Sequence, residues 1–425
     1  MQLADGEGIG QSVPRVEDDR YLRGKGEFIA DIRLSGMREL AFVRSPVAHA
    51  RIRTVRKPKG AEAAVFIAAD LIGVRPIVAV SGLPGFKPSE QPVLADGKVR
   101  HVGEAIAVCV ADNRAMAEDL AAAVEVDFEE LPALVDMRAS LESPTRVHEH
   151  WDNNDFLETF VAVAPERFQR PAPIVVRRRL RTARQCMSPI EGRGVVAVWD
   201  RRLEQLLVYT STQMPHIVRT GLSGCLGLDQ SRIRIVAPDV GGGFGYKGIL
   251  LPEEICAAWL ARKLGHPVRW IEDRREQLTG NANCREHDYD ITVHAEADGT
   301  LIGIDAEAVV DAGAYSAYPF SACLEAAQVA SILPGPYMMQ AYRCRTFSAA
   351  TNKPPILPYR GVARSGVCFA LEVTLDAVAR QAGLEPHEVR LRNLVPAAAM
   401  PFDNITAKHL IAEIIRNVCA ERWRR

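Results

Sequence analysis

A glycine-rich loop is the part of this sequence best suited to binding chemistry. The stretch PDVGGGFGYKG (238–248) holds three adjacent glycines and a fourth after Phe244. Such a run fits neither a helix nor a central strand, and it leaves several backbone N–H groups uncovered by side chains. Amides arranged in this way bind a phosphate or a pterin pyrophosphate group. A plain turn between a strand and a helix is the alternative that these residues alone leave open.

The same loop also matches a second binding pattern. Gly243, Gly245 and Gly248 satisfy GxGxxG, a strand is expected before them and a helix after them, and an acidic pair stands at 272–273. This outline is typical of a dinucleotide-binding unit and would make the protein an NAD- or FAD-binding oxidoreductase. However, the next helix is expected to start only at Pro252, and the acidic pair comes about 25 residues later, a little too far.

The composition narrows the class of protein. The 425 residues are 48% hydrophobic and 25% charged, which are ordinary globular values and exclude a collagen, a coiled coil and a disordered chain. The 52 basic residues balance 53 acidic ones, so no charge excess indicates nucleic acid or an anionic membrane. The nine cysteines are scattered without a CxxC pair. We therefore expect free thiols, a reducing cytoplasmic location and no metal ligated by these side chains. No signal peptide or membrane span is expected.

Both strands and helices are expected around the loop. A strand, helix and strand at 105–110, 113–124 and 125–128 indicate an α/β unit. Apolar patterning and turn residues predict further strands at 39–43, 174–181, 195–199, 205–209, 232–236, 268–271, 290–294 and 301–310, and helices at 215–226, 253–264 and 369–382. The segment 141–172 is rich in Pro and Asn and is expected to be a linker.

Two charged clusters each have a structural and a functional interpretation. Arginines crowd the expected strand around 177–184; we expect a solvated strand face, with contact to an acidic partner subunit as the alternative. His148-Glu149-His150 lies in the expected linker. There a surface location is a better expectation than a metal site, because only two imidazoles stand close together.

Several further motifs share one pattern with the glycine loop. They are RTARQCMSPIEGRGVVAVWD (181–200), TSTQMPHIVR (210–219) and the run that begins LPYRGVARSG at 357. Together with DVGGGFG they resemble the molybdenum-cofactor subunit of the xanthine dehydrogenase and aldehyde oxidase family. PRVEDDRYLRGKGEFIADI (14–32) and FVRSPVAHARI (42–52) are similar to the α/β-hammerhead domain of that family. The resemblance runs from about residue 8 to residue 408.

The resemblance implies a mixed α/β (α+β) fold. It places an α/β-hammerhead domain at 1–140, a linker at 141–172, the first part of a molybdopterin-cofactor-binding domain at 173–408, and a divergent C-terminal tail at 409–425.

The resemblance also implies roles for individual residues. Gln213 would donate a hydrogen bond to the oxo ligand of the metal, and Arg360 would reach the cofactor or the substrate. His216 and Arg219 are weaker candidates; from the residues alone, Gln213 and His216 could simply cap the helix expected at 215. The residues implied to bind the cofactor are Gly242, Gly243, Phe244, Gly245 and Arg360.

The resemblance implies that the protein is an enzyme, a molybdenum-dependent oxidoreductase. It would hydroxylate a carbon of an aldehyde or an N-heterocycle with oxygen from water, which metal coordination turns into a usable nucleophile. A carboxylate general base must take the proton. Since no cysteine pattern for clusters occurs here, the iron–sulfur clusters and the FAD are expected on partner subunits.

Departures from the family pattern refine these expectations. Gly361 stands where copper–molybdenum members that act on carbon monoxide carry a cysteine, and Gly248 stands where xanthine-specific members carry a glutamate. Both differences argue against those substrates. The large subunits of the family run several hundred residues further, and that half carries a second cofactor loop and the catalytic glutamate.

The catalytic base is therefore the missing part of the expected site. Glu325 and Glu191 are candidate pocket carboxylates, although a salt-bridged structural acid is the commoner role. We expect the chain to be incomplete alone, as a truncated or frame-shifted gene product or as one half of a split subunit whose partner is a second fragment. A non-catalytic remnant or assembly partner is the alternative.

Overall fold

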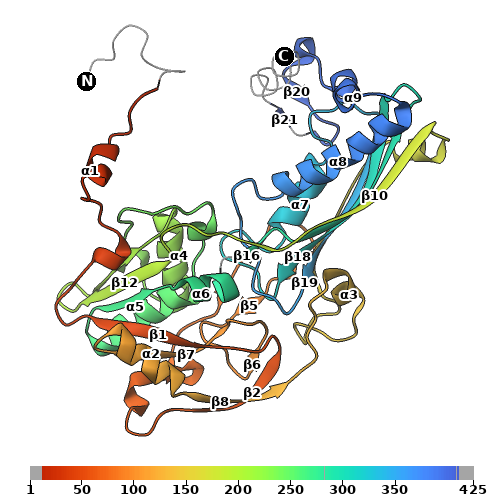
Figure 1. Ribbon diagram of the computed structural model, residues 1–425. Coiled ribbons are helices and arrows are strands. Elements are labelled where there is room, and N and C mark those ends of the chain that lie inside the picture. Colours follow the sequence, from red (N-terminus) through yellow and green to blue (C-terminus); the bar gives the residue numbers. More distant parts are fainter. Residues whose placement is uncertain (1–11, 282, 408, 411–425) are drawn as a thin grey trace.

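Two large sheets organise the chain (Figure 1). The computed structural model describes residues 12–281, 283–407 and 409–410. The first sheet lies at the lower left of Figure 1, and the second runs from the centre to the upper right. The expected mixed α/β class is confirmed, because helices cover both sheets.

The first sheet has seven strands in the order β14-β13-β12-β15-β1-β7-β3. It joins strands from both expected domains, because β1 pairs in parallel with β15 through Arg38 and Val268. The strands are β1 (Arg38–Arg44), β3 (Val65–Ile67), β7 (Ala105–Ala111), β12 (Gly194–Asp200), β13 (Gln205–Thr210), β14 (Ile233–Val236) and β15 (Val268–Ile271).

Helices α4 (Pro215–Leu226) and α5 (Pro252–Leu264) follow β13 and β14, and α2 (Arg114–Ala122) packs on β1 and β7. Most of α5 is buried, including Glu253 and Glu254 in its first turn, and Ile255 and Leu260 are inaccessible to solvent. Each of these two apolar side chains stabilises the fold by roughly 1.5–3 kcal/mol. The start of α2 is capped by the Asn113 side chain, which accepts from the amide of Met116.

The remaining sheets are small. The order β6-β2-β8 forms a three-stranded sheet, and three two-stranded pairs are β4·β5, β11·β16 and β20·β21. Their strands are β2 (Ala50–Arg56), β4 (Ile77–Val78), β5 (Glu90–Gln91), β6 (Lys98–Val99), β8 (Glu125–Glu130), β11 (Gln185–Cys186), β16 (Asn283–Cys284), β20 (Phe402–Asp403) and β21 (His409–Leu410).

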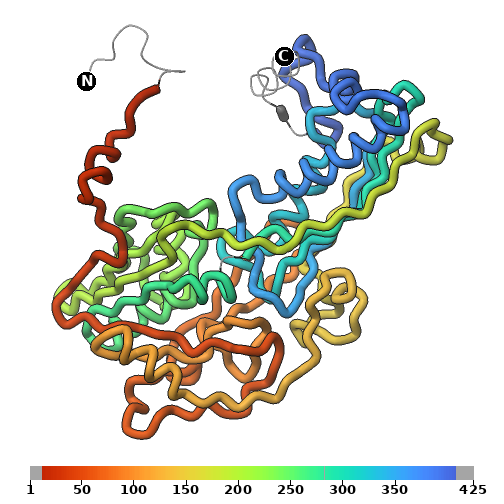
Figure 2. The backbone as a smooth tube through the Cα atoms, in the orientation of Figure 1, coloured from red at the N-terminus to blue at the C-terminus, as the bar shows by residue number. Residues whose placement is uncertain are grey.

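The second sheet has five long strands in the order β10-β17-β18-β19-β9. Helices α7 (Leu324–Ile332), α8 (Arg364–Ala382) and α9 (Pro386–Asn393) cover one of its faces, as Figures 1 and 2 show. The strands are β9 (Asp155–Val163), β10 (Ile174–Thr182), β17 (His287–Ala295), β18 (Leu301–Gly313) and β19 (Ala341–Ala350). The short helix α3 (Met137–Glu142) packs on β18 and β19 of this sheet. Two further short helices are α1 (Asp18–Leu22) and α6 (Arg274–Glu276).

The expectation of a linker at 141–172 is wrong in its central part. Residues Asp155–Val163 form β9, which pairs antiparallel with β19. Pro144 and Pro165 flank this strand without interrupting it. The strand was missed because its partner is about 190 residues away, a distance at which local composition says nothing about pairing.

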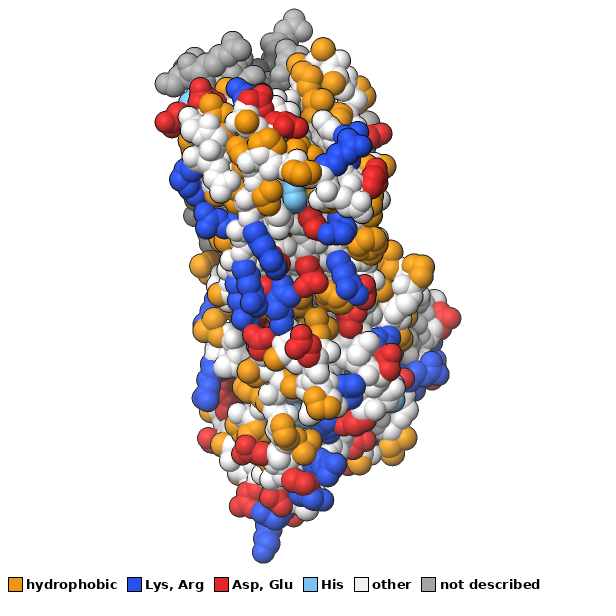
Figure 3. Space-filling view, turned by 90° about the vertical axis from the view of Figure 1, so that its right-hand side faces the viewer, with side chains coloured by type: hydrophobic (Ala, Val, Ile, Leu, Met, Phe, Trp, Pro, Cys, Tyr) orange, Lys and Arg blue, Asp and Glu red, His pale blue; other side chains and the backbone are white. Residues whose placement is uncertain are grey.

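The opposite face of the second sheet is highly charged but internally paired. Arg177 contacts Asp290 at 2.5 Å and Arg179 contacts Asp288 at 3.4 Å. Figure 3, which views the side that faces right in Figure 1, shows basic and acidic side chains interspersed. The expected solvated strand face therefore describes this arginine cluster well.

His148 differs from the expectation of a surface site. Its ring is buried against Trp151, with the ring centroids 4.3 Å apart, and Nε2 donates to the carbonyl of Ala314 at 2.8 Å. Among the described residues, no group of three or more His, Cys, Asp or Glu is placed to hold a metal ion. Nor does any helix in those ranges have the length and apolarity needed to cross a bilayer.

Candidate functional site

The glycine loop (residues 238–248) follows β14 and leads toward α5. Only its last residues, Tyr246–Gly248, form a single 3-10 turn. Within the described ranges, the amides of Gly242, Gly243 and Phe244 donate to no protein acceptor. Three consecutive free N–H groups are what a phosphate or a pterin oxygen needs, so the loop fits the cofactor that its sequence suggests.

Charged side chains fix the loop at its two ends. Glu191 Oε2 accepts from the amide of Gly241 at 2.7 Å and lies 2.6 Å from Lys247 Nζ. Lys247 is fully buried, and this burial lowers its pKa while the nearby Glu191 opposes the shift. The expectation of a salt-bridged structural acid thus describes Glu191, which is not free to act as a base.

The loop is anchored upstream as well. The Asp239 carboxylate accepts hydrogen bonds from the Arg20 guanidinium at 2.7 Å, the Tyr21 hydroxyl at 3.0 Å and the Glu27 backbone amide at 2.8 Å. The hydrogen bond from Arg20 holds the pKa of the Asp239 carboxyl far below its usual range. The N-terminal segment, at the left of Figure 2, is thereby tied to the start of the glycine loop.

A buried polar cluster holds the downstream end of the loop. Arg193 is inaccessible to solvent and donates to the carbonyls of Tyr246 at 3.0 Å and Ile249 at 3.1 Å. It also pairs with Glu254 at 2.8 Å. The Tyr246 hydroxyl donates to Glu272, whose pKa is raised by burial. These contacts fix the buried end of the loop, Tyr246–Gly248, in the core.

Gln213 lies directly on the glycine loop. Its side-chain Oε1 accepts from the backbone N–H of Gly245 at 3.0 Å, and its backbone N–H donates to the carbonyl of Lys247 at 2.8 Å. A Cβ at Gly243 would collide with the Gln213 side chain. No side chain caps the start of α4, so the capping role considered for Gln213 and His216 is wrong. His216 is exposed and Arg219 is only partly buried.

Arg360 reaches the same place from a third segment, the Arg360 loop (residues 357–363). Its amide donates to the carbonyl of Phe244 at 2.7 Å. Gly245 has φ 111°, and a Cβ there would collide with the carbonyl of Pro358. Only glycine permits this approach and this backbone conformation. The structure therefore brings Gln213, the glycine loop and Arg360 together, as expected from the sequence.

Glu325 lies behind this surface. It is buried, and its Oε2 is 2.6 Å from Nε2 of His287. The other ring nitrogen of His287 is 2.7 Å from the Tyr289 hydroxyl. The carboxylate is bound to this histidine, so we assign it no role as the missing base.

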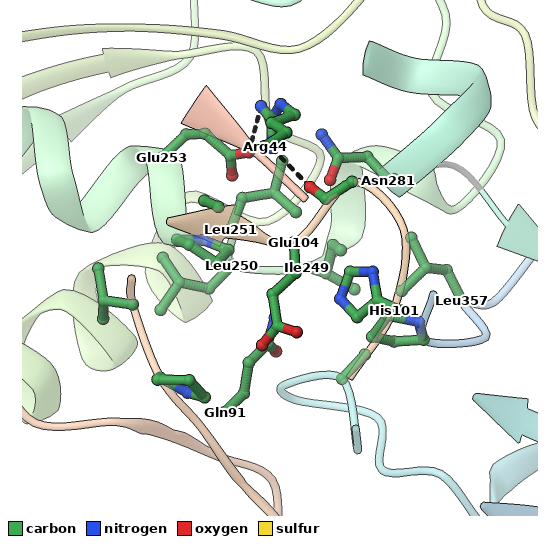
Figure 4. A pocket seen from close by; sticks show the side chains of 18 residues that line it. Arg44, Gln91, His101, Glu104, Ile249, Leu250, Leu251, Glu253, Asn281 and Leu357 are labelled. Atoms are coloured by element: carbon green, nitrogen blue, oxygen red, sulfur yellow. Dashed lines mark hydrogen bonds and ion pairs between the residues drawn. The ribbon is translucent and has the colours of Figure 1, made fainter. Parts of the chain in front are cut away.

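A small cavity lies elsewhere, between the N-terminal part and the residues after the glycine loop (Figure 4). Its volume is about 40 Å³, and Arg44, His101, Glu104 and Glu253 are among its lining residues. Arg44 pairs with Glu253 across its wall at 2.7 Å. This space suits a few water molecules. Gln213 and Arg360 do not line it, so the candidate site is instead the open surface over the glycine loop.

The dinucleotide alternative is not favoured by this geometry. In a dinucleotide-binding unit the helix starts at the last glycine and leads to the adjacent parallel strand. Here α5 starts only at Pro252, and β13 and β12 separate β14 from β15 in the sheet.

Comparison with known proteins places the chain in a family. Residues 142–394 match the molybdopterin cofactor-binding domain. Residues 23–132 match the a/b hammerhead domain of aldehyde oxidase and xanthine dehydrogenase. The chain therefore belongs to the xanthine dehydrogenase and aldehyde oxidase family and carries its molybdopterin-binding domain. The expected hammerhead domain and molybdenum–molybdopterin cofactor are confirmed at this level, while the exact domain boundaries stay predictions.

Three relatives show what the chain is similar to. The large subunit of nicotine 6-hydroxylase from Paenarthrobacter nicotinovorans is 35% identical over 91% of this chain and 48% of that protein. Quinoline 2-oxidoreductase from Pseudomonas putida 86 is 38% identical with a TM-score of 0.91, over 95% of this chain and 52% of that one. The nicotinate dehydrogenase large molybdopterin subunit of Eubacterium barkeri is 29% identical, over 91% of this chain and 89% of that protein.

The chain thus spans about half the length of the first two relatives. The third relative is close to it in length.

Sequence reasoning missed two residues beside the site, Arg285 and His287. Arg285 donates to the carbonyl of Arg360, and His287 binds Glu325. Neither belongs to a motif with recognisable spacing. Their proximity to Arg360 follows from the pairing of strands far apart in the chain.

Proposed function

We propose that this chain is the molybdopterin-binding subunit of a molybdenum hydroxylase that hydroxylates a carbon of an N-heterocycle with oxygen from water. The observation that carries the proposal is the convergence of Gln213, the glycine loop and Arg360, three distant segments, on one surface. Aldehydes are the second substrate class that the family resemblance implies.

The compounds named for two relatives favour an N-heterocycle, and two departures from the family pattern argue against carbon monoxide and xanthine. Quinoline and nicotine, the compounds that name the two relatives of highest identity described above, both contain a ring nitrogen. The chain carries Gly361 where carbon monoxide members are expected to have cysteine, and Gly248 where xanthine-specific members are expected to have glutamate.

The bound cofactor supplies a metal centre that turns water into a nucleophile at neutral pH. The free amides of Gly242, Gly243 and Phe244 bind its phosphate or pterin oxygens. Because Gln213 Oε1 already accepts from Gly245, Nε2 is the atom left to donate to an oxygen ligand of the metal.

Arg360 supplies positive charge on the same surface. Its side chain is exposed and has no carboxylate partner among the described residues. A free guanidinium attracts an anionic group of the cofactor or a developing negative charge on the substrate.

Electrons are proposed to leave through an iron–sulfur subunit to an FAD subunit of the same complex. The eight described cysteines are all free thiols, mostly buried and scattered over the fold. They offer no cluster site, and free thiols of this kind are typical of proteins in the cytoplasm.

We further propose that another segment, on this or a separate polypeptide, provides the second cofactor loop and the catalytic glutamate of the family. Phe244 is 45% exposed, and Ile190, which adjoins Glu191, is 94% exposed. Apolar side chains at an otherwise polar cofactor surface favour a covering partner.

The test is production of Gln213→Ala and Arg360→Ala in a host that makes the cofactor, together with the neighbouring genes. Molybdenum and pterin per chain would be measured, and then hydroxylation of quinoline and of benzaldehyde. We expect both variants to lose at least about tenfold in turnover of quinoline, because a hydrogen bond to a charged group contributes roughly 1.5–3 kcal/mol.

Gln230→Ala, at an exposed position in the 3-10 turn before β14, is the matched control and should behave as the wild type. Wild-type activity in both site variants would overturn the assignment of the site. Activity toward benzaldehyde alone would overturn the N-heterocycle assignment and retain the site.

A further inference from the structure

The segment 283–289, which leads into β17, lies along the Arg360 loop. The amide of Leu357 donates to the carbonyl of Asn283 at 2.8 Å. The Arg285 guanidinium donates to the carbonyls of Arg360 and, at 3.4 Å, of Tyr359. Its carbon Cζ also lies 4.3 Å from the centroid of the Tyr359 ring. One side chain thus holds two successive peptide groups of the loop.

Backbone geometry separates the partners of Arg285 and Glu286. These two residues lie between β16 and β17, and Arg285 has φ 52°. Glu286 pairs with Arg184 and Lys353. Arg285 instead contacts the Arg360 loop, and His287 packs against the start of α8.

The same segment also fixes the start of α8. A Cβ at Gly366 would lie 2.7 Å from Nδ1 of His287 and 2.6 Å from the Tyr289 hydroxyl. The helix therefore packs directly on these two polar groups, which Glu325 holds in place through its contact with His287. The Arg360 loop is clamped between Arg285 at one end and this packing at the other.

Arg285 combines three unfavourable features. It is half-buried, and it has no carboxylate partner in the part of the chain that the structure describes. Its Nε is buried without a hydrogen-bond partner, and its backbone has φ 52°. An unpaired charge, an unsatisfied donor and a left-handed backbone each destabilise the fold. Residues that combine such features cluster at functional sites.

We propose that Arg285 is a positioning residue that aims the Arg360 guanidinium at the cofactor over the glycine loop. Its hydrogen bonds orient the peptide groups on either side of the Arg360 Cα atom. Its positive charge repels the Arg360 side chain, which leaves the glycine-loop side as the favoured direction. Gly361 leaves room for this arrangement, because a Cβ there would lie 3.3 Å from Arg285 Nη2. The inference rests on the proposed contact between Arg360 and the cofactor.

A double-mutant cycle on the holoenzyme tests this inference. Arg285→Ala, Arg360→Ala and the double variant would be purified as the complex, and the rate at which molybdenum and pterin leave the protein on dialysis would be measured. Arg360→Ala removes the guanidinium but keeps the backbone carbonyl that Arg285 binds. The cycle therefore separates an effect through the Arg360 side chain from a general effect on the loop.

We expect Arg285→Ala to speed cofactor loss roughly tenfold in the wild-type background and less than twofold in the Arg360→Ala background. Millimolar guanidinium chloride should slow the loss from Arg285→Ala and leave the double variant unchanged. Arg285→Lys, which keeps the charge without the planar fork, should give an intermediate rate and serves if the alanine variant does not fold.

Arg345→Gln is the control, since this exposed arginine pairs with Glu158 on the far face of the second sheet; it should match the wild type. Equal acceleration by Arg285→Ala in both backgrounds would overturn the positioning role and indicate a structural one. If Arg360→Ala itself left the rate unchanged, the proposed cofactor contact of Arg360 would fail instead, so the two failures are distinguishable.

Discussion

Lys247 Nζ lies 2.6 Å from Glu191 Oε2 beneath the glycine loop, and the same carboxylate oxygen accepts from the amide of Gly241. One side chain from the segment before β12 thus ties both ends of the loop, with the free amides of 242–244 between them. Because Lys247 is fully buried, this geometry must offset the desolvation of both charges.

Removal of Lys247 should destabilise the protein. Lys247→Met leaves the Glu191 carboxylate mostly buried without its counter-ion, and breaking a buried pair in this way costs about 3 kcal/mol or more. The free energy of unfolding, measured with urea, should fall by that amount, and cofactor content should fall with it. The exposed Lys59 provides the control variant Lys59→Met; an equal loss in both would contradict the role of the pair.

The contact between the glycine loop and the Arg360 loop should tolerate no side chain. Gly245→Ala combines a backbone at φ 111° with a collision against the Pro358 carbonyl, so we expect a loss of more than about 2 kcal/mol in stability and loss of bound cofactor. Gly224 in α4 has open space around it. Gly224→Ala should therefore be neutral or stabilise by up to about 1 kcal/mol. Equal thermal unfolding temperatures for the two variants would contradict this packing of the loops.

Stability should depend on pH through His148. Burial lowers the pKa of this imidazole to about 4, whereas the unfolded chain has the ordinary value of about 6.5. Between these values the unfolded state binds more protons, so the free energy of unfolding falls as the pH drops from about 6.5 to about 4. The loss is up to roughly 3 kcal/mol.

His148→Gln should flatten this dependence in urea titrations at several pH values. The exposed His266 supplies the control His266→Gln, which should keep the wild-type slope. An unchanged slope in His148→Gln would exclude His148 as the source.

The thiols should differ in reactivity by location. Cys368 is exposed, whereas burial raises the pKa of Cys109 and Cys344 to about 12. Since the thiolate is the reactive form, a maleimide should label Cys368 first among the eight cysteines that the structure describes. Peptide mapping by mass spectrometry at short reaction times tests this order, and earlier labelling of Cys109 would contradict the packing of β7.

Local patterns predicted those parts of the fold whose contacts are short-range. The helix expected at 215–226 matches α4, and the strands expected at 195–199, 205–209, 290–294 and 301–310 form within the pairs β12·β13 and β17·β18. The strands β9 and β19 were missed because they pair over a long stretch of chain. The seven-stranded sheet likewise crosses the expected domain boundary through the pairing of β1 with β15, which no local composition reveals.

The candidate site was predictable where a motif carried it. Gln213, the glycine loop and Arg360 each stand in a recognisable stretch, and the structure places them in contact. Arg285 carries no such signal. Its importance depends on a left-handed backbone and on a carbonyl 75 residues away, and both arise only when the second sheet forms.

The most direct test of the central claim is the amount of molybdenum and pterin bound per chain, after production in a cofactor-competent host with and without the neighbouring genes. We predict nearly one molybdenum and one pterin per chain in the presence of the completing segment, and loss of both in Gly245→Ala. A wild-type protein that binds neither under any of these conditions, or that instead retains a nicotinamide or flavin dinucleotide, would contradict the claim.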